Sequence, residues 1–298
     1  MSGARRQALV GAGLVVIYTG LIAAADAITK RIADGFEAPQ MFAVSGAIVV
    51  GLSLLLARGK RAAIRTGCPR SMMLRSAATV MAAVAFFQAF RLLPFADVFL
   101  FIGVMPVLAA LMSGAILGEY PRPAAWGALL VGAVGVACLF PAGLHAVEPG
   151  HLWAGFAAVS GTFSMVMARF IGRHESNAIA QVLWPNLALF AVSLVGLPLV
   201  WRPMGLAELG WIAGYAGVLF LARWVSVVAL RLLPAYAVTP LMNLQFVWMI
   251  TLGALAFGEW PAAGTLLGAA IVIASGIYLL WDQMRPERRF ERNLRIEP

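Results

Sequence analysis

Charge is scarce in this chain. Charged residues make up 12% of its 298 residues, and hydrophobic residues make up 62%. An average soluble domain carries about 25% charged residues. A soluble core cannot use so much apolar surface, so the composition predicts a protein that lies in a membrane.

Cysteine and histidine are also rare, which excludes several kinds of site. The two cysteines, Cys68 in a basic loop and Cys138 in an apolar run, form neither a disulfide framework nor a metal-binding spacing. The three histidines fall in or beside loops, no two apolar runs present paired carboxylates, and no phosphate-binding loop occurs. We therefore expect no enzyme, no cofactor, no metal and no direct use of ATP.

One stretch of the chain occurs twice. Residues 91–121 recur as residues 231–261, and both copies open with Arg-Leu-Leu-Pro and close with Gly-Glu-x-Pro. Between these motifs lies an apolar run of about 23 residues, which at 1.5 Å per residue crosses the roughly 30 Å of bilayer hydrocarbon. The repeat predicts two fused halves, a pattern found in many secondary transporters.

Apolar runs predict an all-α integral membrane protein with ten transmembrane helices. An open sheet edge does not survive in lipid, and the runs are too long and continuous for barrel strands. The expected spans are 8–28, 38–57, 72–92, 95–117, 122–141, 151–171, 177–200, 208–232, 235–257 and 261–282. They divide into a five-helix repeat over residues 1–145, a second repeat over 146–284, and a basic tail over 285–298.

Lys and Arg lie unevenly around these spans. With the N-terminus inside, 17 of the 22 fall on the cytoplasmic side, Arg75 among them, four fall on the other side, and Arg223 falls within a span. Cytoplasmic segments carry the excess of Lys and Arg, so both termini are predicted to be cytoplasmic. Because each half contains five spans, an odd number, the second repeat must be inverted in the membrane relative to the first. Inverted repeats place a shared site near the bilayer midplane, and this site becomes accessible from the two sides of the membrane in turn.

The turns AFRLLPFA and ALRLLPAY, the Gly-Glu corners at 118–119 and 258–259, and the closing GAAIVIASGIYLL carry a family resemblance. Over essentially its whole length the chain resembles the drug/metabolite transporter superfamily, EamA type. That resemblance implies a ten-helix transporter of the inner membrane. It assigns Pro94, Pro234, Glu119 and Glu259 to architecture more than to chemistry. Many relatives carry an Arg early in the second span, which this chain lacks.

Two charged residues at membrane depth are candidates for function, since such groups are costly there and usually face a cavity. Arg223 is expected to anchor a carboxylate, a phosphate or a carbonyl-rich ring through its planar fork, or else to reach the inner interface as a snorkelling side chain. Asp26 shares a helix face with Tyr18 and Lys30. It either pairs with Lys30 or acts in gating or proton coupling. Asp97 is expected to cap the helix that begins after Pro94.

Amide and aromatic side chains complete the predicted substrate-binding set. This set comprises Arg223, Asn243, Gln245, Asn186, Trp184, Trp224 and Tyr18. The amides otherwise serve as interhelical hydrogen bonds. An aromatic pocket is expected from Trp184, Trp224, Trp248, Phe86, Phe87 and Phe90, each of which otherwise packs or faces lipid.

These features predict a secondary transporter that moves a small polar or amphipathic metabolite by alternating access. The expected substrates are a flavin-like vitamin, an amino acid or derivative, or a compound similar to S-adenosylmethionine. The alternative is a passive membrane scaffold or a lipid scramblase. Basic residues form no patch interleaved with aromatics, so nucleic acid is not an expected partner. The expected partners are the substrate and the bilayer, with the protein as a monomer or homodimer.

Overall fold

In the computed structural model of the protein, the helices and the segments that join them make up the described residues. These are residues 3–33, 35–58, 60–93, 95–120, 148–233 and 244–257, with scattered positions within 126–134, 238–241 and 267–278. The helices are α1 (Gly3–Ala33), α2 (Ala38–Leu56), the short 3-10 helix η1 (Arg61–Ile64), α3 (Pro69–Leu92), α4 (Phe95–Leu117), α6 (Pro149–His174), α7 (Ala178–Val200), α8 (Leu206–Leu232) and α10 (Gln245–Phe257).

Six of these helices are long and apolar enough to cross a membrane. They are α1, over Leu9–Ala33, and the whole of α2, α3, α6, α7 and α8. The chain is therefore a multi-pass α-helical membrane protein, with six such spans among the described residues rather than the expected ten. The apolar part of α4, Phe101–Leu117, is shorter, and α10 has 13 residues. The expected spans at 122–141 and 261–282 lie mostly outside the described residues, and the tail at 285–298 lies wholly outside them.

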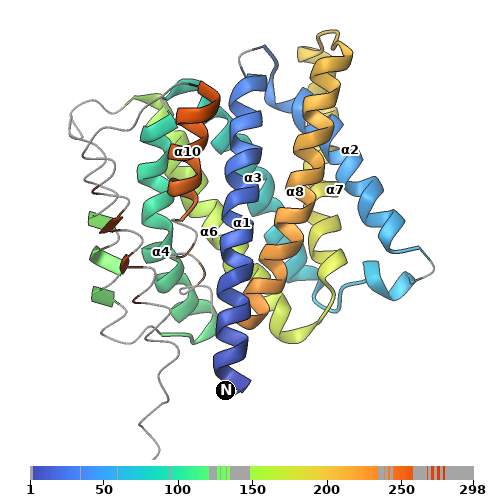
Figure 1. Ribbon diagram of the computed structural model, residues 1–298. Coiled ribbons are helices and arrows are strands. Elements are labelled where there is room, and N and C mark those ends of the chain that lie inside the picture. Colours follow the sequence, from blue (N-terminus) through green and yellow to red (C-terminus); the bar gives the residue numbers. More distant parts are fainter. Residues whose placement is uncertain are drawn as a thin grey trace, which may run out of the picture.

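Helices that are distant in sequence form the main packing pairs. α1 packs along α8, α3 along α6, and α2 along α7, while α4 contacts α6 and α10 contacts α1. Figure 1 shows α4 and α10 on one side of the bundle and α2, α7 and α8 on the other, with α1 between them. In Figure 1 the axes of α1, α4 and α8 run roughly parallel to one another.

Each copy of Arg-Leu-Leu ends a helix against a glycine. At the end of α3, Leu92 and Leu93 lie so close to Gly150 that a Cβ built there would stand 2.5 Å from Leu93 Cγ. At the end of α8, Leu233 approaches Gly11 in the same way, and a Cβ on Gly11 would stand 2.7 Å from Leu233 Cγ. Carbon atoms in contact normally stay about 3.5–4.0 Å apart. Only glycine lets these helix ends approach so closely.

The Gly-Glu corner after α4 fastens that helix to α6. Gly118 has φ +66°, in the left-handed region that glycine adopts without strain. The Glu119 side chain, 10% exposed, accepts hydrogen bonds from Arg169 Nε at 3.1 Å and Arg173 Nη2 at 2.7 Å. These contacts agree with an architectural role for Glu119. The second corner at 258–259 lies outside the described residues, as do Pro94, Pro234 and the side chain of Asp97.

Candidate functional site

A cavity of about 250 Å³ lies between the helices. Its walls come from seven of them: α1, α2, α3, α4, α6, α8 and α10. On α3 the lining extends from Arg75 to Phe90, which is about 22 Å of helix axis at 1.5 Å per residue. This lined length is a large part of the roughly 30 Å of bilayer hydrocarbon.

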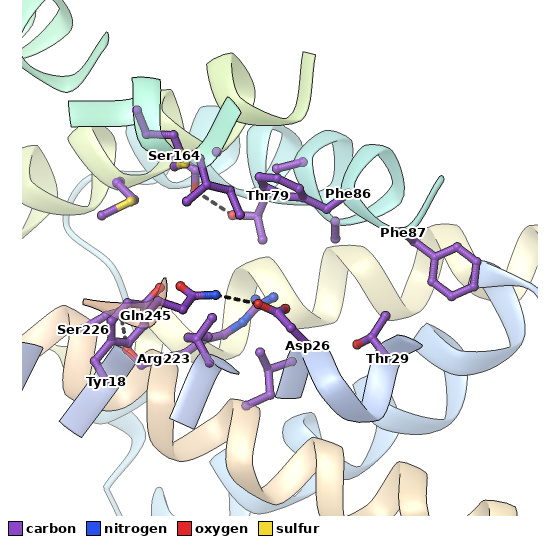
Figure 2. A pocket seen from close by; sticks show the side chains of 18 of the residues that line it. Tyr18, Asp26, Thr29, Thr79, Phe86, Phe87, Ser164, Arg223, Ser226 and Gln245 are labelled. Atoms are coloured by element: carbon purple, nitrogen blue, oxygen red, sulfur yellow. Dashed lines mark hydrogen bonds between the residues drawn. The ribbon is translucent and has the colours of Figure 1, made fainter. Parts of the chain in front are cut away.

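Four residues of the predicted site line this cavity: Tyr18, Asp26, Arg223 and Gln245. Gln245 Nε2 donates a hydrogen bond to Asp26 Oδ2 at 2.6 Å, which joins α10 to α1 across 219 residues of sequence (Figure 2). Asp26 thus faces the cavity, where a gating or coupling role stays a prediction. Arg223 also faces the cavity, from the eighteenth position of the 27-residue α8.

The other predicted residues lie elsewhere. Trp184 is 40% exposed, and its indole N–H donates to the Ile64 carbonyl at 3.0 Å. Asn186 is buried but donates to the Val182 carbonyl one turn earlier on its own helix, at 2.7 Å. Trp224 contacts the Phe220 ring edge-on, with the ring centroids 5.9 Å apart.

None of these three lines the cavity. Asn243 lies outside the described residues. Among the expected aromatic residues, Phe86, Phe87 and Phe90 line the cavity, whereas Trp248 is 42% exposed.

Arg75 is the main residue that sequence reasoning missed. The sequence predicts a cytoplasmic loop position for it, but it lies inside α3, is 8% exposed and lines the cavity. Its Nη1 donates to Gln181 Oε1 on α7 at 2.5 Å. Without Arg75 the cytoplasmic count falls from 17 to 16 against four, so the predicted orientation is unchanged. The available signal was its position within the expected span at 72–92.

The cavity brings together positions that the repeat relates. On α3 and α8, residues 140 apart line it in four pairs: Arg75 with Tyr215, Thr79 with Leu219, Ala83 with Arg223, and Phe86 with Ser226. On α4 and α10, Met105 and Gln245 form a fifth pair with the same spacing. Each pair joins unlike side chains, so the backbone repeats while the lining does not. An asymmetric ligand requires such a surface.

One end of the α3 wall is aromatic. Phe86 and Phe90 stack with ring centroids 6.1 Å apart, and Phe87 meets Phe42 of α2 edge-on at 5.9 Å. Figure 2 shows Phe86 and Phe87 on the wall that faces Asp26 and Arg223, with Thr79 on the same wall. Thr79 and Ser164 share a hydrogen bond of 2.7 Å between their hydroxyls. The cavity thus offers an aromatic surface beside hydrogen-bonding groups.

Hydrogen bonds join distant segments at the start of α2 and at the start of α7. Near the start of α2, Gln40 Nε2 donates to the Arg202 carbonyl at 2.5 Å, and the Arg202 N–H donates back to Gln40 Oε1 at 3.1 Å. Just before α7, Asn177 Nδ2 donates to the carbonyls of Ala62 and Arg65, at 2.7 and 2.8 Å. The first tie fastens α2 to the segment before α8. The second fastens α7 to the segment before α3.

A third contact strengthens the tie at η1. Glu175 accepts hydrogen bonds from the Gly67 N–H at 2.6 Å and from the Thr66 hydroxyl at 3.0 Å. Burial and the negative charge of Glu175 raise the pKa of the neighbouring Cys68 thiol. Within the described residues no group of His, Cys, Asp and Glu has a geometry that would hold a metal ion.

Comparison with known proteins identifies the fold and no more. No family model matches the chain, and no curated protein matches it. Among solved structures 28 chains match. One of them, described only as "Crystal structure of protein", is 20% identical with a TM-score of 0.71, over 94% of this chain and 99% of that chain. The two chains share a fold along almost their whole lengths.

Proposed function

We propose that the protein is a secondary transporter of a small metabolite, built as two inverted five-helix repeats of the EamA type in the inner membrane. Both termini are cytoplasmic in this proposal, and the cavity is the substrate site. The observation that carries it is the lining of that cavity by five pairs of positions 140 residues apart. A single chamber shared by both halves is what alternating access requires.

The packing pairs support the division into two halves. In the two halves, α1 corresponds to α6, α2 to α7, α3 to α8 and α4 to α10. When each helix is replaced by its counterpart, the α1–α8 packing pair becomes the α6–α3 pair, which the structure also contains. The same exchange leaves the α2–α7 pair unchanged and turns the α4–α6 pair into the α10–α1 pair. The glycine contacts follow the same rule, because the Leu93–Gly150 contact corresponds to the Leu233–Gly11 contact. A duplicated module accounts for all of these correspondences at once.

The ties at Gln40 and Asn177 support a gating mechanism. Each fastens the second helix of one half to the segment before the third helix of the other half. Rocking of one half against the other breaks one tie while it preserves the other, and so exposes the cavity on one side at a time. Side-chain and backbone hydrogen bonds suit such a role, since each contributes only about 0.5–1.5 kcal/mol to the closed state.

Two experiments in sequence test the proposal. Purified protein is first screened by thermal shift against a metabolite panel, because a ligand that binds the folded state raises its unfolding temperature by mass action. The ligand found is then offered to proteoliposomes. A transporter shows saturable flux of that ligand. A passive scaffold shows none, and a scramblase moves labelled lipid between leaflets instead.

A matched pair of glycine variants links the flux to the cavity. Gly161 lines the cavity, and a Cβ there would make ordinary van der Waals contact with Met105 and Phe86, both at 3.6 Å. Gly161→Leu therefore fills the cavity and is expected to abolish flux. Gly210→Leu is the control, because nothing lies within 4 Å of a Cβ at that position. Equal flux in both variants would contradict the assignment of the cavity as the transport site.

A further inference from the structure

The cavity holds more positive than negative charge. Among the described residues, two guanidinium groups line it, those of Arg75 and Arg223, and one carboxylate does, that of Asp26. Asp26 already accepts a hydrogen bond from Gln245. Arg75 comes from α3 and Arg223 from α8, and like charges that share one low-dielectric cavity repel each other. An anion placed between the two cations relieves that repulsion.

Buried hydrogen-bond donors without a partner among the described residues lie at Arg75, on the wall of the cavity. Arg75 is 8% exposed, and its Nε has no partner in the part of the chain that the structure describes. In the same part, the Nε2 of Gln181, which contacts Arg75, is also buried without a partner. For Arg223, the only bond found among the described residues is accepted by its backbone carbonyl, from Ser226. Buried donors without partners cost free energy unless a ligand accepts from them.

The apolar part of the cavity suits a flat ring. Phe86, Phe87 and Phe90 follow one another along α3, beyond the polar end that holds Arg75 and Thr79. Aromatic rings pack favourably edge-to-face or offset-stacked against such a cluster. The volume of about 250 Å³ lies below the roughly 300–1,000 Å³ of pockets that hold drug-sized ligands. The ligand is accordingly a small one, with a single ring system.

We infer that the substrate is a small aryl carboxylate anion. Its carboxylate binds between Arg75 and Arg223, and its ring packs against the phenylalanines of α3. Planar guanidinium groups bind carboxylates through paired hydrogen bonds, which favours a carboxylate over a single-point acceptor. The claim that this ligand crosses the membrane rests on the proposed function. The claim that it binds does not.

The test uses ligands that share one ring and differ in charge. Indole-3-acetate carries the anion, indole-3-acetamide is its neutral counterpart, tryptamine is the cation, and tryptophan is the zwitterion. Acetate keeps the carboxylate and lacks the ring. Affinity is measured from the concentration dependence of the thermal shift of the full-length protein in detergent. Indole-3-acetate is expected to bind at least about tenfold more tightly than indole-3-acetamide, because the amide leaves a buried charge unpaired.

Variants at the arginines separate the charge effect from a general one. Arg223→Gln is expected to lower the preference for indole-3-acetate over its amide to about one, since it removes one of the two guanidinium groups that line the cavity. Arg75→Gln should act in the same direction. Because this variant also loses the hydrogen bond to Gln181, size-exclusion chromatography checks that it is folded. Arg70→Gln is the control, because Arg70 is exposed on the same helix and does not line the cavity.

Several results would overturn the inference. Equal binding of the acetamide, or tighter binding of tryptamine, excludes an anion site. Tighter binding of tryptophan than of indole-3-acetate makes the substrate a zwitterion with Asp26 as the partner of its ammonium group. Binding of acetate as tight as that of indole-3-acetate excludes the ring site, and no shift with any ligand excludes both. If indole-3-acetate binds but shows no saturable flux in proteoliposomes, the anion site is supported and the proposed transport function is contradicted.

Discussion

Replacing Gly150 with alanine tests the contact that the repeated Arg-Leu-Leu motif makes. The new methyl group would stand 2.5 Å from Leu93 Cγ, 2.8 Å from Leu93 Cδ2 and 3.1 Å from Leu92 Cβ. Leu93 is 6% exposed and packs against Ala89, Val98 and Ala154, so it has little room to move away. Overpacking of this kind costs about 1–3 kcal/mol. We expect Gly150→Ala to lower the free energy of unfolding by that amount.

A second substitution identifies the cause. Leu93→Ala by itself leaves a cavity and costs about 2–5 kcal/mol. In the Gly150→Ala, Leu93→Ala double variant the alanine methyl enters the vacated space. The loss of unfolding free energy in the double variant is therefore expected to be smaller, by about 1 kcal/mol or more, than the sum of the losses in the two single variants. Gly210→Ala is the matched control, since nothing lies within 4 Å of its Cβ, and alanine in an open helical position stabilises by about 0.5–1 kcal/mol.

The measurement is the thermal unfolding midpoint in detergent, read for all four variants under one condition. For chains approaching this size 1 kcal/mol corresponds to about 2–4 °C. Gly150→Ala should therefore melt several degrees below the parent protein, and Gly210→Ala at or above it. A Gly150→Ala protein as stable as Gly210→Ala, or strict additivity in the double variant, would refute the steric argument.

Three further predictions concern other contacts. Glu119→Gln removes the charge that pairs with Arg169 and Arg173. It is expected to destabilise the protein by about 1–3 kcal/mol, as unfolding in detergent would reveal, because hydrogen bonds to a charged group are lost. In a background that lacks the other cysteine, Glu175→Gln should speed maleimide labelling of Cys68 at pH 8. Loss of the negative charge lowers the raised pKa of the thiol and increases the fraction of thiolate, which is the reactive form. An unchanged labelling rate would contradict the effect of Glu175 on Cys68. Trp184→Phe should leave ligand affinity within about twofold, because Trp184 lies outside the cavity; a loss of tenfold places it in the site.

Sequence reasoning found the helical membrane class and four residues that line the cavity. Arg223 and Asp26 were identifiable because charge at membrane depth is rare enough to be noticed residue by residue. Arg75 was not, because it follows a run of basic loop residues and the end of a helix is not fixed by hydropathy. Trp184 and Asn186 differ from these residues, because neither lines the cavity. Polarity or size marked them as candidates, but the face of α7 that they occupy is set by packing.

The amino-acid sequence alone determined that the chain is apolar enough to lie in a membrane, that one motif occurs twice 140 residues apart, and that few charges lie within the apolar runs. These properties are written in composition and spacing. Only the tertiary structure decided that α3 and α8 bring Arg75 and Arg223 to one cavity, with Asp26 engaged by Gln245. The reason is physical. Hydropathy is similar on every side of an apolar helix, so the facing of each side chain is set by close packing against helices that are distant in sequence.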